Sequence, residues 1–462
     1  MKDPTYKRCK CRDDDDRELG ARCPKLHRSD GSWNPRHGTW YYVLELPRGQ
    51  GGKRKPQLRR GGFGSQADAL VAWERARDKL RLGVDPSARL TVGQYLAGWF
   101  AERRDLKPKT QRNYSQIIAT YLDPLLGHIS LDNFRSHHVA EMIATIEHWN
   151  DELAAGRPVR KYQRHVGPAA MQRIRACLRA ALNDAPDGLI AYNPAAKVSM
   201  TPEKRQKPVV WTAGRAEAFW TEYQARLDAA KEAADGKHVN AFDVWRRMDL
   251  RPAPVMVWLP QDTGAFLDYA TRHRLSALFE VVAATGMRRG EICGLPWTDV
   301  DLVGQELTVM VSRVQVGWQP QEGEPKSDAS KRTIALDAAT VAALRAHRKR
   351  QVADRLAWAD AWVESGKVFT AEDGSALHPA SVTLLFERLS FAAHLPPIRL
   401  HDMRHGAATY GLAAGLDVKL MQERLGHSTS ALTRDVYTSV LPEVARAAAE
   451  TAAAMIPRRR AR

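Results

Sequence analysis

Near the start of the chain, apolar residues alternate with other residues, and further along they recur at helical spacing. Apolar side chains stand at every second position from Trp40 to Leu46, which predicts a half-buried strand. A helix with a capped start is expected to follow. Its expected inward residues are Leu70, Trp73 and Ala76. Residues 38–85 therefore predict a small sheet packed on one helix.

The next region, residues 88–200, has the pattern of an all-helical domain. Thr91 and Gln94 form a capping-box pattern at a predicted helix start. An apolar stripe at helical spacing follows and predicts a core-facing helix. The stripe consists of Tyr114, Ile117, Ile118, Tyr121 and Leu122. Cys177 lies in another helical pattern and is expected in the core.

Two similar apolar stretches, PVVW and PVMVW, flank a charged and helix-prone segment within residues 203–260. We interpret residues 212–253 as an insertion at the entrance of a last domain, residues 203–456, and assign it no role. Cys293 lies in an apolar helix end of this domain and is also expected in the core.

The last domain also predicts two strands and a pair of helices. Residues 307–316 and 332–336 read as strands, joined by a polar connection. A helix over 401–415 is followed by a second one that should end at Gly426, leaving His427 at an exposed turn. The fold class expected from these patterns is multidomain and mainly α, with small sheets in the first and last domains.

Composition adds a candidate partner. The 462 residues carry 70 Lys and Arg against 53 Asp and Glu, a formal charge of +17, which favours a polyanion such as DNA because counterions are released on binding. A solvated basic surface is the alternative. The chain lacks the long apolar run of a membrane span and the apolar segment of a signal peptide, so a cytoplasmic location is expected.

An odd number of cysteines, three of them close together, argues against a disulfide framework. Residues 1–37 contain Cys9, Cys11, Cys23 and His27, which could bind structural zinc as three thiolates and one imidazole. His37 is the substitute fourth ligand. The alternative is a disordered tail.

A set of phosphate-binding residues and one tyrosine stand near the end of the chain. His401, Arg404 and His427 are suited to bind a phosphate, and Tyr437 follows ten residues after the last of them. If the first two lie in a helix, their spacing puts both on one face. This combination is typical of a nucleophilic tyrosine accompanied by residues that bind the phosphate it attacks.

Four ordered motifs resemble the tyrosine recombinases, or phage-type integrases. They are H-x-x-R at 401–404, L-G-H-S at 425–428, the tyrosine at the expected distance, and T-G-x-R, which places Arg288 upstream with Glu291 three residues later. The resemblance implies site-specific DNA cleavage and rejoining through a 3′-phosphotyrosine intermediate. It also implies an arm-type DNA-binding domain at 38–85 and a core-binding domain at 88–200.

Chemistry suggests roles for these residues. Arg288 and Arg404 would clamp the phosphate, because arginine is always charged and forked, and His427 would add a third donor. His401, titrating near neutrality, would take the proton of Tyr437.

The polar connection before the second strand resembles the hairpin that carries the family's catalytic lysine. The resemblance implies that Lys326, in a P-K-S context, protonates the departing 5′ oxygen, with Lys331 as the competing candidate. Glu291 is expected either to orient the cations or to be a buried carboxylate that satisfies their charge. Tyr410 and His405 point away from the clamp on a helix and are expected to be structural.

Backbone contacts to DNA are expected from two basic groups, and a solvated surface is the alternative for each residue. The groups are Lys53, Arg54 and Lys55 in the arm-type domain, and Lys107, Lys109, Thr110 and Arg112 in the core-binding domain. The resemblance further implies a tetramer around two duplexes, with an excisionase or host DNA-bending proteins as further partners. The basic tail, 457–462, has no assigned role, and no metal or other cofactor is expected for the chemistry.

Two alternative functions are compatible with all or some of these motifs. A topoisomerase-like enzyme would use the same tyrosine chemistry to reseal the original strand, and a regulator would bind DNA without catalysis. The arm-like domain disfavours the first, and the full set of catalytic residue types disfavours the second.

Overall fold

In the computed structural model, the chain divides into two compact units, residues 1–203 and 204–462. The described residues are 3–47, 57–81, 86, 90–186, 189–200, 208–247, 251–317, 319–324, 330–426, 446, 449, 450 and 453.

The first unit begins with an antiparallel sheet of order β2-β1-β3-β4, against which one helix packs. Its elements are β1 (Thr5–Arg12), β2 (Glu18–Gly20), the 3-10 helix η1 (Pro24–Leu26), β3 (Thr39–Glu45), β4 (Gln57–Phe63) and α1 (Gln66–Arg81). Residues 1–37, expected to form a segment of their own, instead supply two strands of this sheet. The reason is that β1 pairs with β3, with Thr5 opposite Tyr42.

The core of this sheet consists of Tyr42, Leu44, Leu58 and Ala76. The alternation from Trp40 onward is confirmed, since Trp40, Tyr42 and Leu44 are buried. The expected inward position of Leu70 is wrong: this side chain is 39% exposed, whereas Ala69 is fully buried. Ala76 is buried as expected, and Ala69, seven residues before it, takes the inward position in place of Leu70.

The rest of the first unit is helical, as its periodicity predicts. Its elements are α2 (Val92–Glu102), α3 (Pro108–Ile117), the π-helix η2 (Ile118–Leu122), α4 (Asp123–Leu126), η3 (Leu131–Asn133), α5 (Ser136–Ala154), α6 (Pro168–Asn183) and η4 (Pro194–Ala196). The capping box of Thr91 and Gln94 is present at the start of α2. Cys177, on α6, is fully buried in the core.

The second unit opens with a parallel pair of short strands, β5 (Val209–Val210) and β6 (Met256–Val257), formed by the two similar apolar stretches. Between them lie α7 (Ala213–Ala233) and α8 (Ala241–Arg247). Phe219 and Tyr223 of α7 and Trp245 of α8 belong to the main core of the unit. The segment interpreted as an insertion is therefore part of this domain's core.

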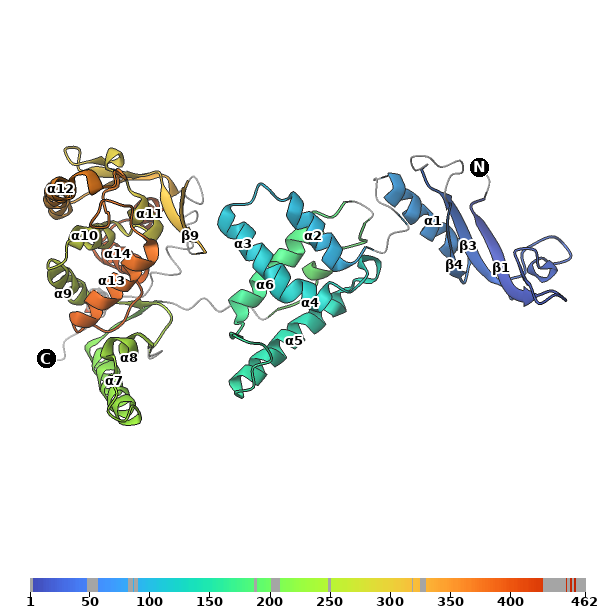
Figure 1. Cartoon of the computed structure of the whole chain (residues 1–462), viewed down its shortest axis with the longest axis horizontal. Helices are drawn as coiled ribbons and strands as arrows, with labels where there is room; N and C mark the ends of the chain where they lie inside the picture. The colour runs from blue at the N-terminus through green and yellow to red at the C-terminus, as the bar shows by residue number, and fades with distance from the viewer. Residues whose placement is uncertain are drawn as a thin grey trace, which may run out of the picture. The chain divides into compact units, whose positions relative to one another are not determined.

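The helices α9 (Pro260–Ala270), α10 (Ser276–Thr285), α11 (Arg289–Gly294), α12 (Ala338–Trp358), α13 (Pro379–Ala392), α14 (Asp402–Ala413) and α15 (Val418–Leu425) follow, with 3-10 helices η5 (Trp297–Asp299) and η7 (Ala359–Ala361). α10 and α14 lie side by side (Figure 1). Cys293, on α11, is fully buried, as expected.

Two small antiparallel sheets complete the unit. One has the order β11-β8-β7 and the other pairs β10 with β9. Their strands are β7 (Val300–Asp301), β8 (Glu306–Val309), β9 (Ser312–Val316), β10 (Gln319–Gly323) and β11 (Arg332–Ala335). The single strand expected over 307–316 is wrong, because the chain leaves one sheet after Val309 and enters the other at Ser312. The mainly helical, multidomain fold class is confirmed. Among the described helices, none is long and apolar enough to cross a membrane.

Candidate functional site

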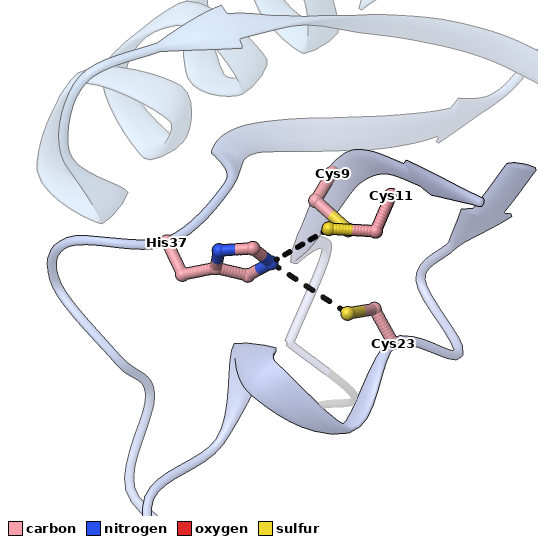
Figure 2. Close-up of side chains that lie close together, drawn as sticks. All are labelled: Cys9, Cys11, Cys23 and His37. Carbon is pink, nitrogen blue, oxygen red and sulfur yellow. Dashed lines mark hydrogen bonds between the residues drawn. The ribbon is translucent and has the colours of Figure 1, made fainter. Parts of the chain in front are cut away.

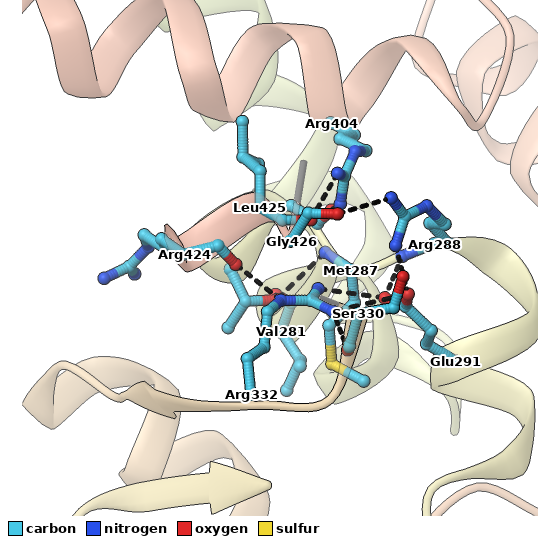
Figure 3. Close-up of polar contacts among 12 residues, drawn as sticks. Val281, Met287, Arg288, Glu291, Ser330, Arg332, Arg404, Arg424, Leu425 and Gly426 are labelled. Atoms are coloured by element: carbon cyan, nitrogen blue, oxygen red, sulfur yellow. Dashed lines mark hydrogen bonds and ion pairs between the residues drawn. The ribbon is translucent and has the colours of Figure 1, made fainter. Parts of the chain in front are cut away.

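Two arginines from different helices meet at the end of α15. Arg404, in the first turn of α14, is 2% exposed and donates from Nη2 to the carbonyl of Leu425. Arg288, which precedes α11, donates from Nη2 to the next carbonyl, that of Gly426, at 3.0 Å (Figure 3). The structure therefore brings the two predicted clamp residues to consecutive peptide groups, directly before His427 in the sequence.

Gly286, at the end of α10, allows the side chains of Arg404 and Leu425 to lie close to its backbone. Its carbonyl accepts a hydrogen bond from Nη1 of Arg404 at 2.7 Å, and its φ of +66° ends α10 in the left-handed conformation. A Cβ at this position would lie 2.7 Å from Cδ2 of Leu425 and 3.5 Å from Cγ of Arg404. Only glycine fits between these two side chains in this conformation.

Glu291 is buried beneath the clamp and forms two ion pairs. Its carboxylate accepts from Nη1 of Arg288 at 2.6 Å and from Nη2 of Arg332 at 2.9 Å, and it also accepts the backbone N–H of Arg288 at 2.9 Å. Burial alone would raise the pKa of Glu291, but the hydrogen bonds and charge of Arg332 and Arg288 outweigh it and hold this pKa below its usual value. Glu291 is thus a buried carboxylate that pairs with two cations, Arg288 and Arg332.

Arg332 is a site residue that the sequence interpretation missed. Its side chain is 6% exposed and links Glu291 to α15, because Nε donates to the carbonyl of Arg424 at 2.7 Å (Figure 3). It lies on β11 two residues before the buried Ile334, so both share one face of the strand. The sequence did contain a signal for this residue: an arginine on the same face of a strand as its buried apolar residues indicates a buried ion pair.

His401 stands at the start of α14, where the buried carboxylate of Asp402 accepts hydrogen bonds from the backbone and side chain of Arg399. Desolvation of the ring and then repulsion from His405 and Arg404 lower the pKa of His401 to about 4, although the residue as a whole is exposed to solvent. The pKa expected for His401, near neutrality, is therefore too high for the protein without DNA. At pH 7 the ring is neutral and can accept a proton.

Tyr410 is not available as a nucleophile. Its hydroxyl donates to the carbonyl of Trp258 at 2.8 Å and lies 2.8 Å from Oγ1 of Thr263. Burial raises the pKa of Tyr410 to about 12. The structural role expected for this tyrosine is consistent with these contacts. His405 packs against His401, with ring centroids 5.4 Å apart, and burial lowers its pKa to about 4.

Three of the predicted catalytic residues, Lys326, His427 and Tyr437, lie outside the described residues. The competing lysine, Lys331, is described, and its Nζ lies 3.2 Å from Oε2 of Glu324 in an ion pair.

Of the predicted DNA-contacting residues, the group in the first unit's helical part gathers at the start of α3. Lys107, Lys109 and Arg112 are exposed and Thr110 is partly buried. The other group, Lys53, Arg54 and Lys55, lies outside the described residues, in the connection between β3 and β4.

The N-terminal cysteines converge, but with a different histidine from the one first expected. Cys9, Cys11, Cys23 and His37 place one ligand atom each within 4.8 Å of one another (Figure 2). His37 belongs to this set because it lies two residues before β3, the strand that pairs with β1.

His27 is turned away from this cluster. Its Nδ1 lies 3.1 Å from the Gly31 carbonyl oxygen, and its ring packs on Trp33 with centroids 4.1 Å apart. The structure therefore replaces His27 with His37 as the fourth candidate ligand.

Comparison with known proteins gives two family matches, "Phage integrase family" over residues 261–443 and "Phage integrase, N-terminal SAM-like domain" over residues 91–146. The "Tyrosine recombinase XerC-like" protein of Caldanaerobacter subterraneus subsp. tengcongensis is 34% identical over 191 residues, 39% of this chain and 49% of that protein. The match thus spans about half the length of this relative. The integrase of Mycobacterium phage L5 is 24% identical over 408 residues, 86% of each chain.

Among solved structures, the Tn1549 transposon integrase (residues 82–397) in complex with a circular intermediate DNA has a similar fold. The TM-score is 0.53 at 19% identity, covering 79% of this chain and 99% of that one. The motifs, the paired arginines and both family matches agree, and the chain belongs to the phage integrase family of tyrosine recombinases.

Proposed function

We propose that this chain is a site-specific DNA recombinase, an integrase that inserts or excises a mobile element through a 3′-phosphotyrosine intermediate. The observation that carries the proposal is the meeting of Arg288 and Arg404 at the peptide groups of Leu425 and Gly426. The names of two similar proteins, a phage integrase and a transposon integrase solved with DNA, support it.

The paired guanidinium groups suit a DNA phosphodiester. During cleavage, negative charge builds on the nonbridging oxygens, and preorganised donors lower the barrier because they need no rearrangement. A guanidinium has five N–H groups. Arg288 uses two of its N–H groups on Glu291 and Gly426, and its side chain is 35% exposed, so a phosphate can reach it. Loss of one such donor typically costs about 100- to 1000-fold in rate.

In the proposed reaction, Oη of Tyr437 attacks phosphorus while the bond to the 5′ oxygen breaks. The tyrosine proton, with an ordinary pKa of about 10, passes to a base, and the departing 5′ oxygen takes up a proton. Neutral His401 is the base we assign, and an anionic phosphate beside it would raise its low pKa and favour proton uptake. His427 contributes a further donor. The new phosphotyrosine bond preserves the energy of the broken bond, so the reverse attack by a 5′ hydroxyl needs no ATP and no metal.

Lys326 is the acid we assign to the leaving group. Lys331 supports that choice because its Nζ is engaged in an ion pair with Glu324, 3.2 Å from Oε2. Lys326→Ala should abolish strand cleavage, and Lys331→Ala should retain most of it.

The sheet of the first unit and the start of α3 are the proposed DNA-binding surfaces, through Lys53, Arg54 and Lys55 and through Lys107 to Arg112. Four protomers around two duplexes would carry out the exchange in the cytoplasm, where the DNA lies. An excisionase or DNA-bending proteins would set its direction.

Strand exchange tests the proposal. Two labelled duplexes, built on a sequence selected for binding from a random pool, should give recombinant products with the wild-type chain. Arg288→Ala should reduce product by about 100-fold or more. Relaxation of a supercoiled plasmid without recombinants would favour a topoisomerase-like enzyme instead. Binding without either product would favour a regulator, and both outcomes would overturn the proposal.

A further inference from the structure

We propose that Cys9, Cys11, Cys23 and His37 bind one structural Zn²⁺ ion that holds the N-terminal part of the first sheet together. This site is remote from the proposed chemistry in the sequence, and the inference does not rest on the proposed function.

The distances fit a tetrahedral zinc site. With Zn–S of about 2.3 Å and Zn–N of about 2.0 to 2.1 Å, the sulfur and nitrogen atoms of such a site lie about 3.6 Å apart. Sγ of Cys11 and Sγ of Cys23 lie 3.5 and 3.6 Å from Nε2 of His37 (Figure 2). All four ligand atoms lie within 4.8 Å of one another.

Hydrogen bonding alone explains this arrangement poorly. Two thiols converge on the same ring nitrogen of His37, which offers a single lone pair or a single N–H in the plane of the ring. That nitrogen can satisfy one thiol well but not both. A metal ion between the three atoms takes the lone pair of each, which satisfies all of them.

The scaffold around the cluster presents the ligands from separate segments. Cys9 and Cys11 are two residues apart on β1, so their side chains share one face of the strand. Nζ of Lys7, a buried residue on the same strand, donates to the carbonyls of Asn34 at 2.5 Å and of His37 at 3.1 Å. This lysine thereby fixes the loop that carries His37 against β1.

The segment between β1 and β3 has little apolar core of its own. Cys23 and Leu26 are its buried hydrophobic residues among those described, and its regular structure is limited to β2 and η1. Such a segment cannot offset the entropy of ordering its backbone by apolar burial, and a bound metal is a common substitute.

Metal content of the full chain is the first test. Chain purified under reducing conditions should contain one zinc per protomer, and exchange for Co²⁺ should give the visible bands of a tetrahedral site and the charge-transfer band of cobalt-bound thiolates. His37→Ala should lower Co²⁺ affinity by more than about 100-fold, since loss of outer-shell partners alone typically costs 10- to 100-fold. His27→Ala is the matched control and should leave affinity and spectrum unchanged.

Limited proteolysis tests the structural role. Chelation should expose sites between residues 13 and 38 to protease, while the fragments of the second unit stay intact. A Tyr437→Phe chain should bind the metal like the wild type, so a failed metal test and a failed recombination test remain distinguishable. The proposal is overturned if the reduced full chain holds no zinc and shows no Co²⁺ spectrum, or if His27→Ala weakens binding and His37→Ala does not.

Discussion

Replacing Glu291 with Gln should loosen the clamp, because it removes the buried negative charge that pairs with Arg288 of the clamp and with Arg332. The side chains of Glu291 and Arg332 are 2% and 6% exposed, and that of Arg288 is 35% exposed. Breaking a buried ion pair typically costs about 3–5 kcal/mol because the remaining charge has no partner. Glutamine keeps the size of the side chain and one acceptor oxygen, so we expect about 3 kcal/mol.

Hydrogen exchange measures this effect locally, which matters because a chain of several domains has no single unfolding free energy. About 3 kcal/mol corresponds to roughly 100-fold faster exchange, at 1.4 kcal/mol per tenfold, in amides of α11, β11 and α15 that open only through this network. Strand cleavage should fall by about tenfold, since Arg288 remains but loses its ion pair with residue 291.

Glu387→Gln is the matched control. Glu387 pairs with Arg246 at 2.7 Å in the same unit, but the two side chains are 21% and 49% exposed, so the cost should be below about 1 kcal/mol. The reasoning is refuted if Glu291→Gln and Glu387→Gln give the same exchange and the same cleavage rate.

The pH dependence has a defined sign. The folded pKa of Glu291 lies below its unfolded value of about 4.3, so its contribution to stability is complete above that pH and is lost as the pH falls through the folded pKa. The difference between wild type and Glu291→Gln should therefore be constant near pH 7 and shrink below about pH 4.3.

Three further outcomes follow from the site. Gly286→Ala should destabilise the end of α10 by about 1–2 kcal/mol from the left-handed backbone alone and reduce cleavage further through the contact with Leu425 of α15, as exchange and cleavage assays would show; wild-type values would contradict it. Tyr410→Phe should cost about 1–2 kcal/mol in stability yet keep full cleavage, and a loss of cleavage in a folded variant would contradict its structural role. Because His401 and His405 have folded pKa values of about 4, below an unfolded value of about 6.5, stability of the second unit should fall as pH drops from 6.5 to 4; replacing both with Gln should flatten this profile, and an unchanged profile would contradict it.

Local signals in the sequence predicted local structure well. The capping box at Thr91, the left-handed end of α15 at Gly426 and the alternation beginning at Trp40 all depend on residues a few positions apart. The inward position assigned to Leu70 is occupied instead by its small neighbour Ala69, which an apolar pattern based on large side chains does not mark. The break between β8 and β9 depends on partner strands, which the apolar run from 307 to 316 does not encode.

The site was predictable as a set of residue types but not as a network. Arg288 and Arg404 were expected to act together, but their meeting at Leu425 and Gly426 depends on the packing of α10, α14 and α15. Arg332 was missed because its partner, Glu291, lies on a different element. His27 was the first choice and His37 the substitute, because the sequence alone does not show that β1 pairs with β3, which brings His37 to the cysteines.

The identity of the residue that becomes bound to DNA tests the central claim most directly. A nicked duplex built on a selected binding sequence should trap the wild-type chain covalently, and peptide mapping by mass spectrometry should find the nucleotide on Tyr437. Tyr437→Phe should leave binding intact and abolish the adduct. An adduct on any other residue, or trapping that persists in Tyr437→Phe, would contradict the account.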